Sequence, residues 1–438
     1  MKHTLHVMGL PALKARALGV LLACAATAGQ AQQQITIGQL VGNGAVTVDQ
    51  GENIGQATMT IEQNTIVGGN VVVVDQGRND GAITATIAQA GSDNNVRIDQ
   101  MDNVGINDAR AAQSGENNTA TLTQTGSIMV SASIDQTGTR NTATVTQNGS
   151  MDTTATVVQD GNGNIADVIQ PRGTADVLQA GAYNIASVTG MGGDIAQHGR
   201  GNEASIAVST TQSSASIDQS GTRNDARIVI DGGATSSVAV AQNGLENTLR
   251  YTGSPVITSA RMSESGASNV ADVEQRFSGQ SSLRLELDGN FNRAALTQGA
   301  TFRSSIHVQA VGSSNVASVF QDGLKDSYVI MEQNGFGNTA DVRQVESAPG
   351  GEVLWASVRQ DGSANRFFVE QTGSQMSTSA QQTGDGNQLR VVQEGVFNYS
   401  IIDQAGTGNL AAVAQAGSSA YLTLAQSGLS NTASINQH

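Results

Sequence analysis

The chain has 438 residues and a formal net charge of −15, yet charged residues make up only 13% of it. Aromatic residues are 3%, and Gly reaches 51 residues against 4 Pro. A large globular core draws on more Leu, Phe, Tyr and Trp than this, so an ordinary multidomain globular protein is excluded. With 38% hydrophobic residues the chain is too apolar to stay disordered, so its apolar side chains must be buried in another way.

Residues 1–31 have the features of a secretory signal peptide. Lys2, Lys14 and Arg16 make the start basic, Ala17–Ala28 is a short apolar run, and small residues precede a cleavage point after Ala31. The apolar run is too short to span a bilayer. We therefore expect an exported protein that consists of residues 32–438.

The only cysteine, Cys24, lies inside this signal. It follows Leu21, Leu22 and Ala23, an order also typical of a lipoprotein signal, so lipidation of Cys24 stays open. With cleavage after Ala31 no disulfide can form. Removal of the three cations takes the formal net charge from −15 to −18 and leaves Lys325 as the one lysine. Such a surface is unsuited to nucleic acid and is repelled by anionic lipid.

A short repeat dominates the remaining sequence. From Gln360 a glutamine recurs every 11 residues up to Gln437, and from Asn365 an asparagine recurs every 22 residues. The stronger half-repeat reads Gln-x-Gly-x-x-Asn-x-Ala-x-Val-x-Gln. Its Gly-x-x-Asn core occurs in sixteen copies, with asparagines at 94, 118, 141, 164, 184, 202, 224, 247, 269, 292, 315, 338, 365, 387, 409 and 431. Earlier copies, such as Gln50–Asn53 and Gln76–Asn79, are looser and fit atypical terminal repeats.

Each copy alternates with period two. After Gln113, residues Asn118, Ala120, Leu122 and Gln124 share one side, and threonines take the positions between them. Period two is typical of a strand, and the Gly-x-x step is typical of a turn. Two such strands are not stable alone, but copies stacked in register bury their apolar sides. The sequence predicts an all-β fold, a β-solenoid with two strands per rung of about 22 residues.

The inward Gln and Asn residues predict side-chain ladders. A buried amide without a partner costs about 1–3 kcal/mol, whereas identical amides one rung apart satisfy each other. We expect this ladder to include Gln113, Asn118, Gln136, Asn141, Gln333, Asn338, Gln360, Asn365, Gln382, Asn387, Gln404, Asn409, Gln426, Asn431 and Gln437. The matching turn glycines are Gly115, Gly138, Gly335, Gly362, Gly384, Gly406 and Gly428.

Three stretches depart from the pattern, near residues 170–215, 230–264 and 345–359. Repeats shorten around Asn184 and Asn202, and an insertion precedes Asn365. The prolines of the mature chain, Pro171, Pro255 and Pro349, all lie in these stretches. We interpret them as distorted rungs or bulged loops within a single domain.

The pattern Gln-x-Gly-x-x-Asn-x-Ala-x-x-x-Gln closely resembles the repeat of curlins, the subunits of curli fibres, over residues 39–437. The resemblance implies secretion through an outer-membrane channel by curli-type machinery of a Gram-negative bacterium. It also implies polymerisation, with other curlin-type subunits as further partners, into an extracellular fimbrium used in adhesion and biofilm. The chain is unusually long for a curlin and its central copies are degenerate, so major subunit and nucleator both stay open.

The residues themselves also favour polymerisation. A linear solenoid has an unpaired strand edge at each end, and the regular copies continue to Gln437 with no obvious cap. Acidic residues often precede a ladder Gln and are expected to point outward, where like charges oppose stacking. They are Asp49, Glu62, Asp75, Asp99, Asp135, Asp218, Glu274, Glu332, Glu370 and Asp403. An ordinary solubilising surface is the alternative interpretation of these acids.

Other chemistry finds little support in the sequence. The five His residues, at 3, 6, 198, 307 and 438, form no nucleophile–His–acid set, so no catalysis, cofactor or small-molecule substrate is expected. Residues 160–164 loosely resemble a calcium loop but lack its sixth-place Gly and its final acid, so we interpret them as a repeat turn. Outward threonine rows, as at Thr119 and Thr142, stop after two rungs, which argues against ice binding. A monomeric cell-surface adhesin remains the alternative to a fibre subunit.

Overall fold

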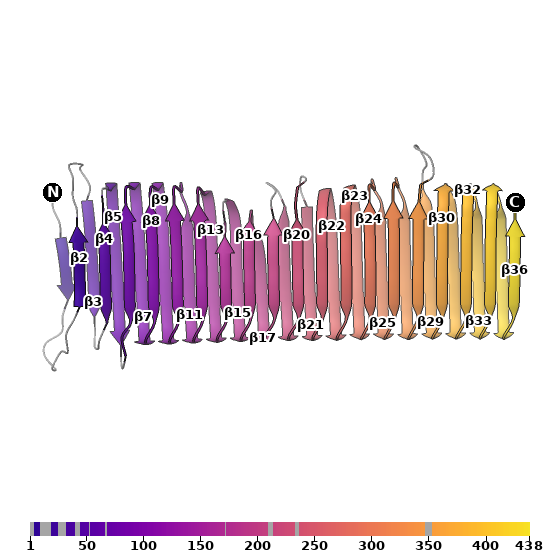
Figure 1. The fold of residues 1–438 in the computed structure, drawn as a ribbon, viewed down its shortest axis with the longest axis horizontal. Coiled ribbons are helices and arrows are strands. Elements are labelled where there is room, and N and C mark those ends of the chain that lie inside the picture. Colours follow the sequence, from indigo (N-terminus) through magenta and orange to yellow (C-terminus); the bar gives the residue numbers. More distant parts are fainter. Residues whose placement is uncertain are drawn as a thin grey trace. The chain divides into compact units, whose positions relative to one another are not determined.

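A computed structural model describes residues 4–8, 19–24, 32–39, 44–51, 53–65, 68–170, 172–208, 213–232, 236–346 and 353–438. The chain divides into two compact units, Met1–Val208 (unit 1) and Ser209–His438 (unit 2), and each unit is treated by itself. All of the regular secondary structure in the described residues is β-strand, and none of it is helix (Figure 1).

Unit 1 consists of two columns of parallel strands, because each strand pairs with the next but one along the chain. One column contains β1 Thr4–Met8, β3 Gln32–Gln39, β5 Ile54–Thr65, β7 Asp80–Ser92, β9 Val104–Glu116, β11 Ser131–Thr139, β13 Met151–Asn162, β15 Arg172–Ala182 and β17 Gly193–Arg200. The other contains β2 Gly19–Cys24, β4 Ala45–Gln50, β6 Val71–Gly77, β8 Asn95–Met101, β10 Thr119–Thr125, β12 Thr142–Asn148, β14 Ile165–Ile169, β16 Ile185–Gly190 and β18 Glu203–Val208.

Unit 2 repeats this arrangement. Its odd column contains β19 Ser214–Thr222, β21 Ser236–Leu245, β25 Ser305–Ser313, β27 Tyr328–Phe336, β29 Leu354–Ser363, β31 Met376–Asp385, β33 Tyr399–Thr407 and β35 Tyr421–Leu429. The even column contains β20 Asp225–Ile230, β24 Arg293–Gly299, β26 Val316–Asp322, β28 Thr339–Val345, β30 Arg366–Ser374, β32 Gln388–Val396, β34 Leu410–Ser418 and β36 Thr432–Gln437. Two long strands, β22 Thr248–Ala267 and β23 Val270–Asn290, contribute one arm to each column.

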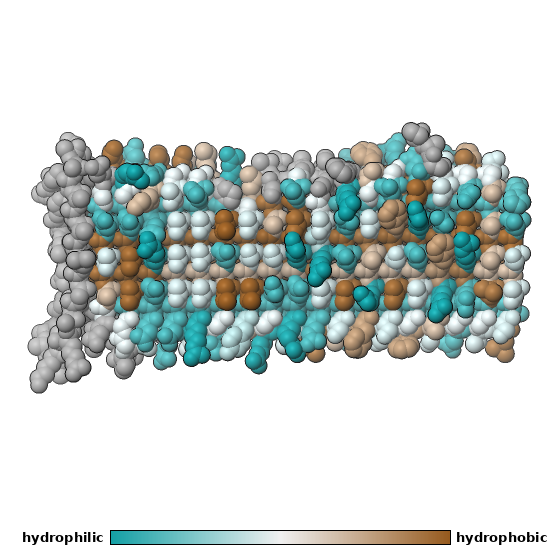
Figure 2. Space-filling view, in the orientation of Figure 1, coloured by the Kyte–Doolittle hydropathy of each residue, from teal (hydrophilic) through white to brown (hydrophobic). Residues whose placement is uncertain are grey.

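Neighbouring rungs pair in register, so equivalent residues of the repeat lie next to each other. Between β10 and β12, for example, Ala120 pairs with Ala143 and Gln124 pairs with Gln147. Figure 2 shows the result on one face, where residues of like hydropathy line up in bands across neighbouring strands. The predicted fold class, a β-solenoid with two strands per rung, is confirmed within each unit.

The interior follows the predicted alternation. In β10, Ala120, Leu122 and Gln124 are buried while the threonines between them face outward. The interior apolar side chains are mostly Ala, Val, Ile and Leu, so each rung contributes a thin apolar layer between the two columns. Because a rung alone buries little, stacking supplies most of the apolar burial.

Some predictions fall partly or wholly outside the described residues. Pro171, Pro349 and the cleavage point after Ala31 lie outside the described residues. Within the predicted signal, β1 pairs with β3, and β2 pairs with β4. Pro255 lies in β22, where the pairing with β23 shifts register between Ser254 and Val256.

The interpretation of the earliest copies was wrong. Gln50, Asn53, Gln76 and Asn79 do not form loose versions of the strong half-repeat. They occupy the opposite corner of the rung, where Gln50 donates to Gln76 at 2.9 Å and Asn79 donates to Asn53 at 3.1 Å. The sequence contains two half-repeats in alternation, one for each column of strands. Near the start of the chain, the half-repeat of the even strands follows the Gln-x-x-Asn pattern more closely than that of the odd strands.

Candidate functional site: the amide ladders

The seven predicted turn glycines lie where an odd strand ends, and all have a positive φ between 105° and 123°. At Gly384, a Cβ atom would lie 2.1 Å from the carbonyl oxygen of Gly406 in the next rung. The glycine is therefore required both by its backbone conformation and by the close approach of the following rung. This corner sets the spacing at which the next rung can pair.

The predicted asparagines link the same corners from rung to rung. The backbone N–H of Asn118 donates to Oδ1 of Asn94 at 3.0 Å, and Nδ2 of Asn118 donates to the carbonyl of Gly138 at 3.0 Å. In the last rungs, Asn409 donates in the same way to Asn387 and to Gly428. Each buried amide is satisfied by both neighbours, so the corners form a continuous hydrogen-bonded column within a unit.

Glutamines of the odd strands form the first side-chain ladder. In unit 1 it runs from Gln63 through Gln89, Gln113, Gln136, Gln159 and Gln179 to Gln197, with Nε2–Oε1 distances of 2.7–3.0 Å. In unit 2 the predicted Gln333, Gln360, Gln382, Gln404 and Gln426 are joined at 2.7–2.9 Å.

Glutamines of the even strands form a second ladder. It joins Gln50, Gln76, Gln100, Gln124 and Gln147 in unit 1 at 2.7–2.9 Å. In unit 2 it joins Gln275, Gln298, Gln321, Gln344, Gln371, Gln393, Gln415 and Gln437 at 2.6–2.9 Å. The eleven-residue period of the sequence is thus the alternation of two ladders.

The ladder glutamines also tie the two columns together. Nε2 of Gln113, in β9, donates its second hydrogen to the carbonyl of Asn95, the first residue of β8 in the other column, at 3.1 Å. Gln404 makes the equivalent bond to Gln388 at 3.2 Å. Gln113 and Gln404 therefore bond both along the stack and across it, which satisfies groups that would be expensive to bury alone.

All glutamine–glutamine bonds of the two ladders run in one sense, whereas the asparagine column also has bonds in the other sense, such as Nδ2 of Asn118 donating to Oδ1 of Asn94 in the preceding rung. Nε2 of a glutamine donates to Oε1 of the glutamine in the following rung, so an Oε1 loses its ladder donor where the preceding rung has no amide. This applies to Gln333, whose predecessor in register is Ala310, and its buried Oε1 has no partner. Oε1 of Gln50 is likewise buried and unpartnered.

The last described rung, β35 with β36, is built like the others but is covered on one side only. Nothing else in the described part of the chain covers it. Its inward side chains Leu424 and Ile435 are half-buried, whereas the equivalent Ile402 and Val413 one rung earlier are buried. The rung thus presents apolar side chains and unpaired backbone at an edge, a surface suited to pairing with another strand.

Substitutions interrupt both ladders in unit 2. In the odd ladder, Glu264, Leu287 and Ala310 stand at successive positions between Gln242 and Gln333. In the even ladder Gly253 precedes Gln275, and the buried Tyr251 donates its hydroxyl to Oε1 of Gln275 at 2.7 Å. Burial raises the pKa of the Tyr251 phenol, so it remains a neutral donor.

The structure places every predicted ladder residue in a ladder or a corner column, but sequence reasoning missed others. Ser127 and Ser150 replace Asn in the opposite corner, where Ser127 donates to the carbonyl of Gln147 at 2.9 Å. Tyr251 and Glu264 replace ladder amides. Only the register of the strands identifies these residues, because none of them matches the consensus.

The ten acids next to the ladder are outward, as expected, since none is buried. Only three of them stack on one another, because Asp75 pairs with Asp49 on one side and with Asp99 on the other. Partial burial and these two carboxylates raise the pKa of Asp75, although nearby Arg97 opposes the shift. Asp135, by contrast, lies between Ala112 and Val158.

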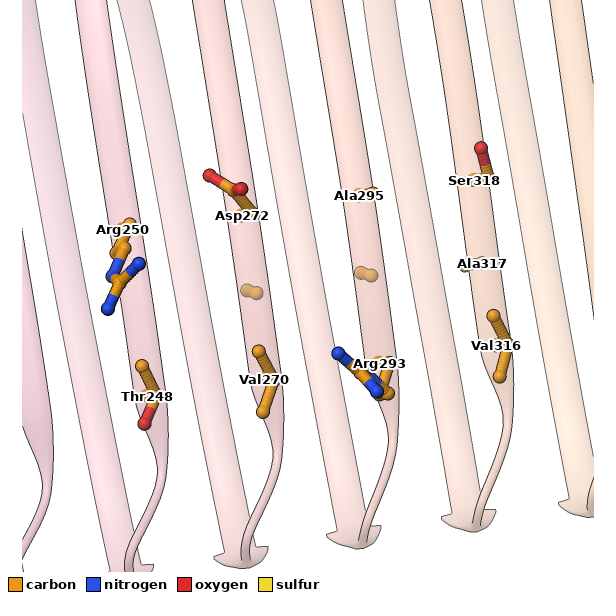
Figure 3. Close-up of a pocket in the computed structure, with 11 residues that line it drawn as sticks. Thr248, Arg250, Val270, Asp272, Arg293, Ala295, Val316, Ala317 and Ser318 are labelled. Atoms are coloured by element: carbon orange, nitrogen blue, oxygen red, sulfur yellow. The ribbon is translucent and has the colours of Figure 1, made fainter.

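A shallow hollow of about 430 Å³ lies on the outer side of the even column of unit 2 (Figure 3). Small residues such as Ala295 and Ser318 form its floor, and Arg250 and Arg293 flank Asp272 on it. No three His, Cys, Asp or Glu side chains converge on a metal-sized site in the described ranges. Residues 160–164 occupy a repeat corner, with Asn164 in the asparagine column.

Comparison with known families decides the identity of the repeat. The family model described as the curlin-associated repeat matches residues 192–221 and residues 384–417. The chain carries curlin repeats in these two segments. Curlin repeats build structural subunits of extracellular surface fibres, not enzymes.

The two segments that match the curlin repeat contain ladder residues, among them Gln197, Asn202, Gln404 and Asn409. No curated protein matches the chain. Among the described residues no helix is long and apolar enough to cross a membrane.

Proposed function

We propose that this protein is a structural subunit of an extracellular, curli-like functional amyloid fibre. The observation that carries the proposal is the last described rung. It has the glutamines, the corner and the alternation of the regular rungs from β29 to β34, and no strand among the described residues pairs with its outer edge. A second copy could continue both the strands and the amide ladders there, with the in-register spacing of about 4.8 Å typical of cross-β fibres.

The proposal includes the route to the surface. The predicted signal, residues 1–31, directs export and is removed, and curli-type machinery in the outer membrane of a Gram-negative bacterium releases the chain. The fibre then supports cell adhesion and the biofilm matrix, alone or with other curlin-type subunits. The family resemblance supports these steps, and the low content of Lys and aromatic residues fits a fibre that binds neither nucleic acid nor a small substrate.

The test is incubation of purified residues 32–438 at neutral pH, followed by thioflavin fluorescence and electron microscopy. We expect fibres after a lag, and faster growth when preformed fibres are added as seeds. A soluble β-rich monomer that never binds the dye would contradict assembly and would favour a monomeric adhesin. Weak growth alone but efficient seeding of another curlin would indicate a nucleator.

A further inference from the structure

One carboxyl group of unit 2 lies in the interior, where a glutamine is expected. Glu264, in β22, pairs in register with Gln242 on one side and with Leu287 on the other. Its residue is 1% exposed. Oε2 accepts a hydrogen bond from Nε2 of Gln242 at 2.7 Å, and Oε1 is buried without a partner.

The neighbouring rung shows what a glutamine does at this place. Gln242 donates its second amide hydrogen to the carbonyl of Asp225 in the even column, at 2.9 Å. Asp225 pairs in register with Thr248, so the carbonyl of Thr248 is the equivalent acceptor for residue 264. An ionised Glu264 has no hydrogen for it. A protonated Glu264 has one, and its other oxygen still accepts from Gln242.

We propose that Glu264 is a proton-controlled joint in unit 2. Protonated, its carboxyl replaces a ladder glutamine and ties the two columns together. Deprotonated, it places an uncompensated charge between β21, β22 and β23 and loosens the stack there. The proposal concerns the stability of the solenoid itself, and only its consequence for fibre growth rests on the proposed function.

The surroundings of Glu264 contain nothing that would compensate a negative charge. β21 has no charged residue. Apart from Glu264, the charged residues of β20, β22 and β23 occupy the outward positions of their strands, and none is buried. They are Asp225, Arg227, Arg250, Arg261, Asp272, Glu274, Arg276, Arg284, Glu286 and Asp288. Tyr251 is the other buried titratable group, and its hydroxyl is engaged with Gln275.

Burial raises the pKa of Glu264 to about 8, although the hydrogen bond from Gln242 opposes the shift. The folded chain then keeps the proton over a pH range in which the unfolded chain has lost it. Stability is therefore highest below the ordinary pKa of a glutamate and falls as the pH rises toward about 8, with no further loss above that. In that range the equilibrium constant for folding of the joint falls by up to about tenfold per pH unit.

The first experiment compares residues 32–438 of the wild type with the same chain carrying Glu264→Gln or Glu286→Gln. Glu286→Gln is the control, because it removes an outward carboxyl from the adjacent strand β23. Urea midpoints are measured at pH 5, 7 and 9, and amide hydrogen exchange of β21–β23 is compared at pH 8.5. We expect the wild-type and Glu286→Gln midpoints to fall with pH clearly more than that of Glu264→Gln, which keeps only the fall caused by outward acids such as Asp75. Equal responses of all three chains would overturn the proposal.

Infrared spectroscopy gives a second, independent readout. A protonated carboxyl band should persist at pH 7 in the wild type and in Glu286→Gln, and be missing in Glu264→Gln. If the wild type shows no such band above pH 6, Glu264 is ionised and the joint does not exist, whatever the variant does. Chains that never form fibres but show the band and the midpoint shift would contradict the proposed function and leave the joint intact.

Discussion

Two parts of unit 2 have the same backbone but different interiors. From β29 to β36 every odd strand carries a ladder glutamine, and so does every even strand. Between β22 and β25, Glu264, Leu287 and Ala310 replace the odd ladder, yet the strands still pair in register. Register is therefore set by the apolar alternation and the corner columns, and the glutamine ladders add stability to a rung that is already specified.

The corners should be the more sensitive of the two features. Gly384→Ala would place a methyl group 2.1 Å from a backbone carbonyl at a φ of +105°. We expect a loss of about 3 kcal/mol or more in the free energy of unfolding, since overpacking costs about 1–3 kcal/mol and the backbone conformation a further 1–2 kcal/mol. Urea denaturation followed by circular dichroism measures it.

Gly386→Ala is the matched control for the corner. It lies two residues away at a φ of +65°, and a Cβ atom there meets nothing within 4 Å. Only the backbone term of about 1–2 kcal/mol should remain. Equal losses in the two variants would mean that close approach of the rungs does not set the spacing.

Breaking a ladder in the regular part should have the next largest effect. Gln382→Leu removes the acceptor for Gln360 and the donor to Gln404 while the side chain stays apolar and similar in size. Because both neighbours remain buried, we expect a loss of about 1–3 kcal/mol. Gln381→Leu, one residue earlier and exposed, should change stability by no more than about 0.5 kcal/mol. If Gln382→Leu lowers the free energy of unfolding no more than Gln381→Leu does, the hydrogen bonds of the ladder contribute little to stability beyond the space that the side chain fills.

The stacked acids should give the smallest effect, and one that depends on pH. The pKa of Asp75 is raised in the folded chain, so this carboxyl reduces stability as the pH rises past its ordinary range. Asp75→Asn should raise the urea midpoint at pH 7 and leave it unchanged at pH 3, where the wild-type carboxyl is protonated. Asp135→Asn, without a stacked acid, should change neither.

The same acids bear on the rate of assembly. If stacked carboxylates delay polymerisation, seeded growth should be faster at pH 4 than at pH 7, and Asp75→Asn should reduce the difference. Growth that is no faster at pH 4 would leave the acids as ordinary solubilising surface. The three stacked positions at Asp49, Asp75 and Asp99 are where the idea has a structural basis.

The sequence predicts the solenoid because one short pattern recurs many times. A single Gln-x-Gly-x-x-Asn segment has many possible structures, but sixteen phased copies are compatible only with units that stack in register. Ladder membership of Gln113 or Gln404 followed from the same phasing. The use of the ladders as an assembly surface between copies stays a prediction.

What the sequence could not give is the role of residues that replace the pattern. Tyr251 reaches the even ladder because Gly253 leaves space for its ring, and Glu264 enters the odd ladder because β22 keeps register with β21. Both depend on which strand lies beside which, and no local signal reports that. The second corner, with Asn79 and Ser127, was missed because Asn and Ser exchange there.

The single sense of the glutamine bonds gives each glutamine ladder an electrical direction. Backbone dipoles in a sheet largely cancel, but the side-chain amides of a ladder all point the same way and their dipoles add, as peptide dipoles do along a helix. Within unit 2, partial positive charge therefore collects toward Gln426 and Gln437, and partial negative charge toward the opposite end of each run of amides. Two copies that meet tail to tail would oppose like poles, so the amides favour a fibre whose two ends differ.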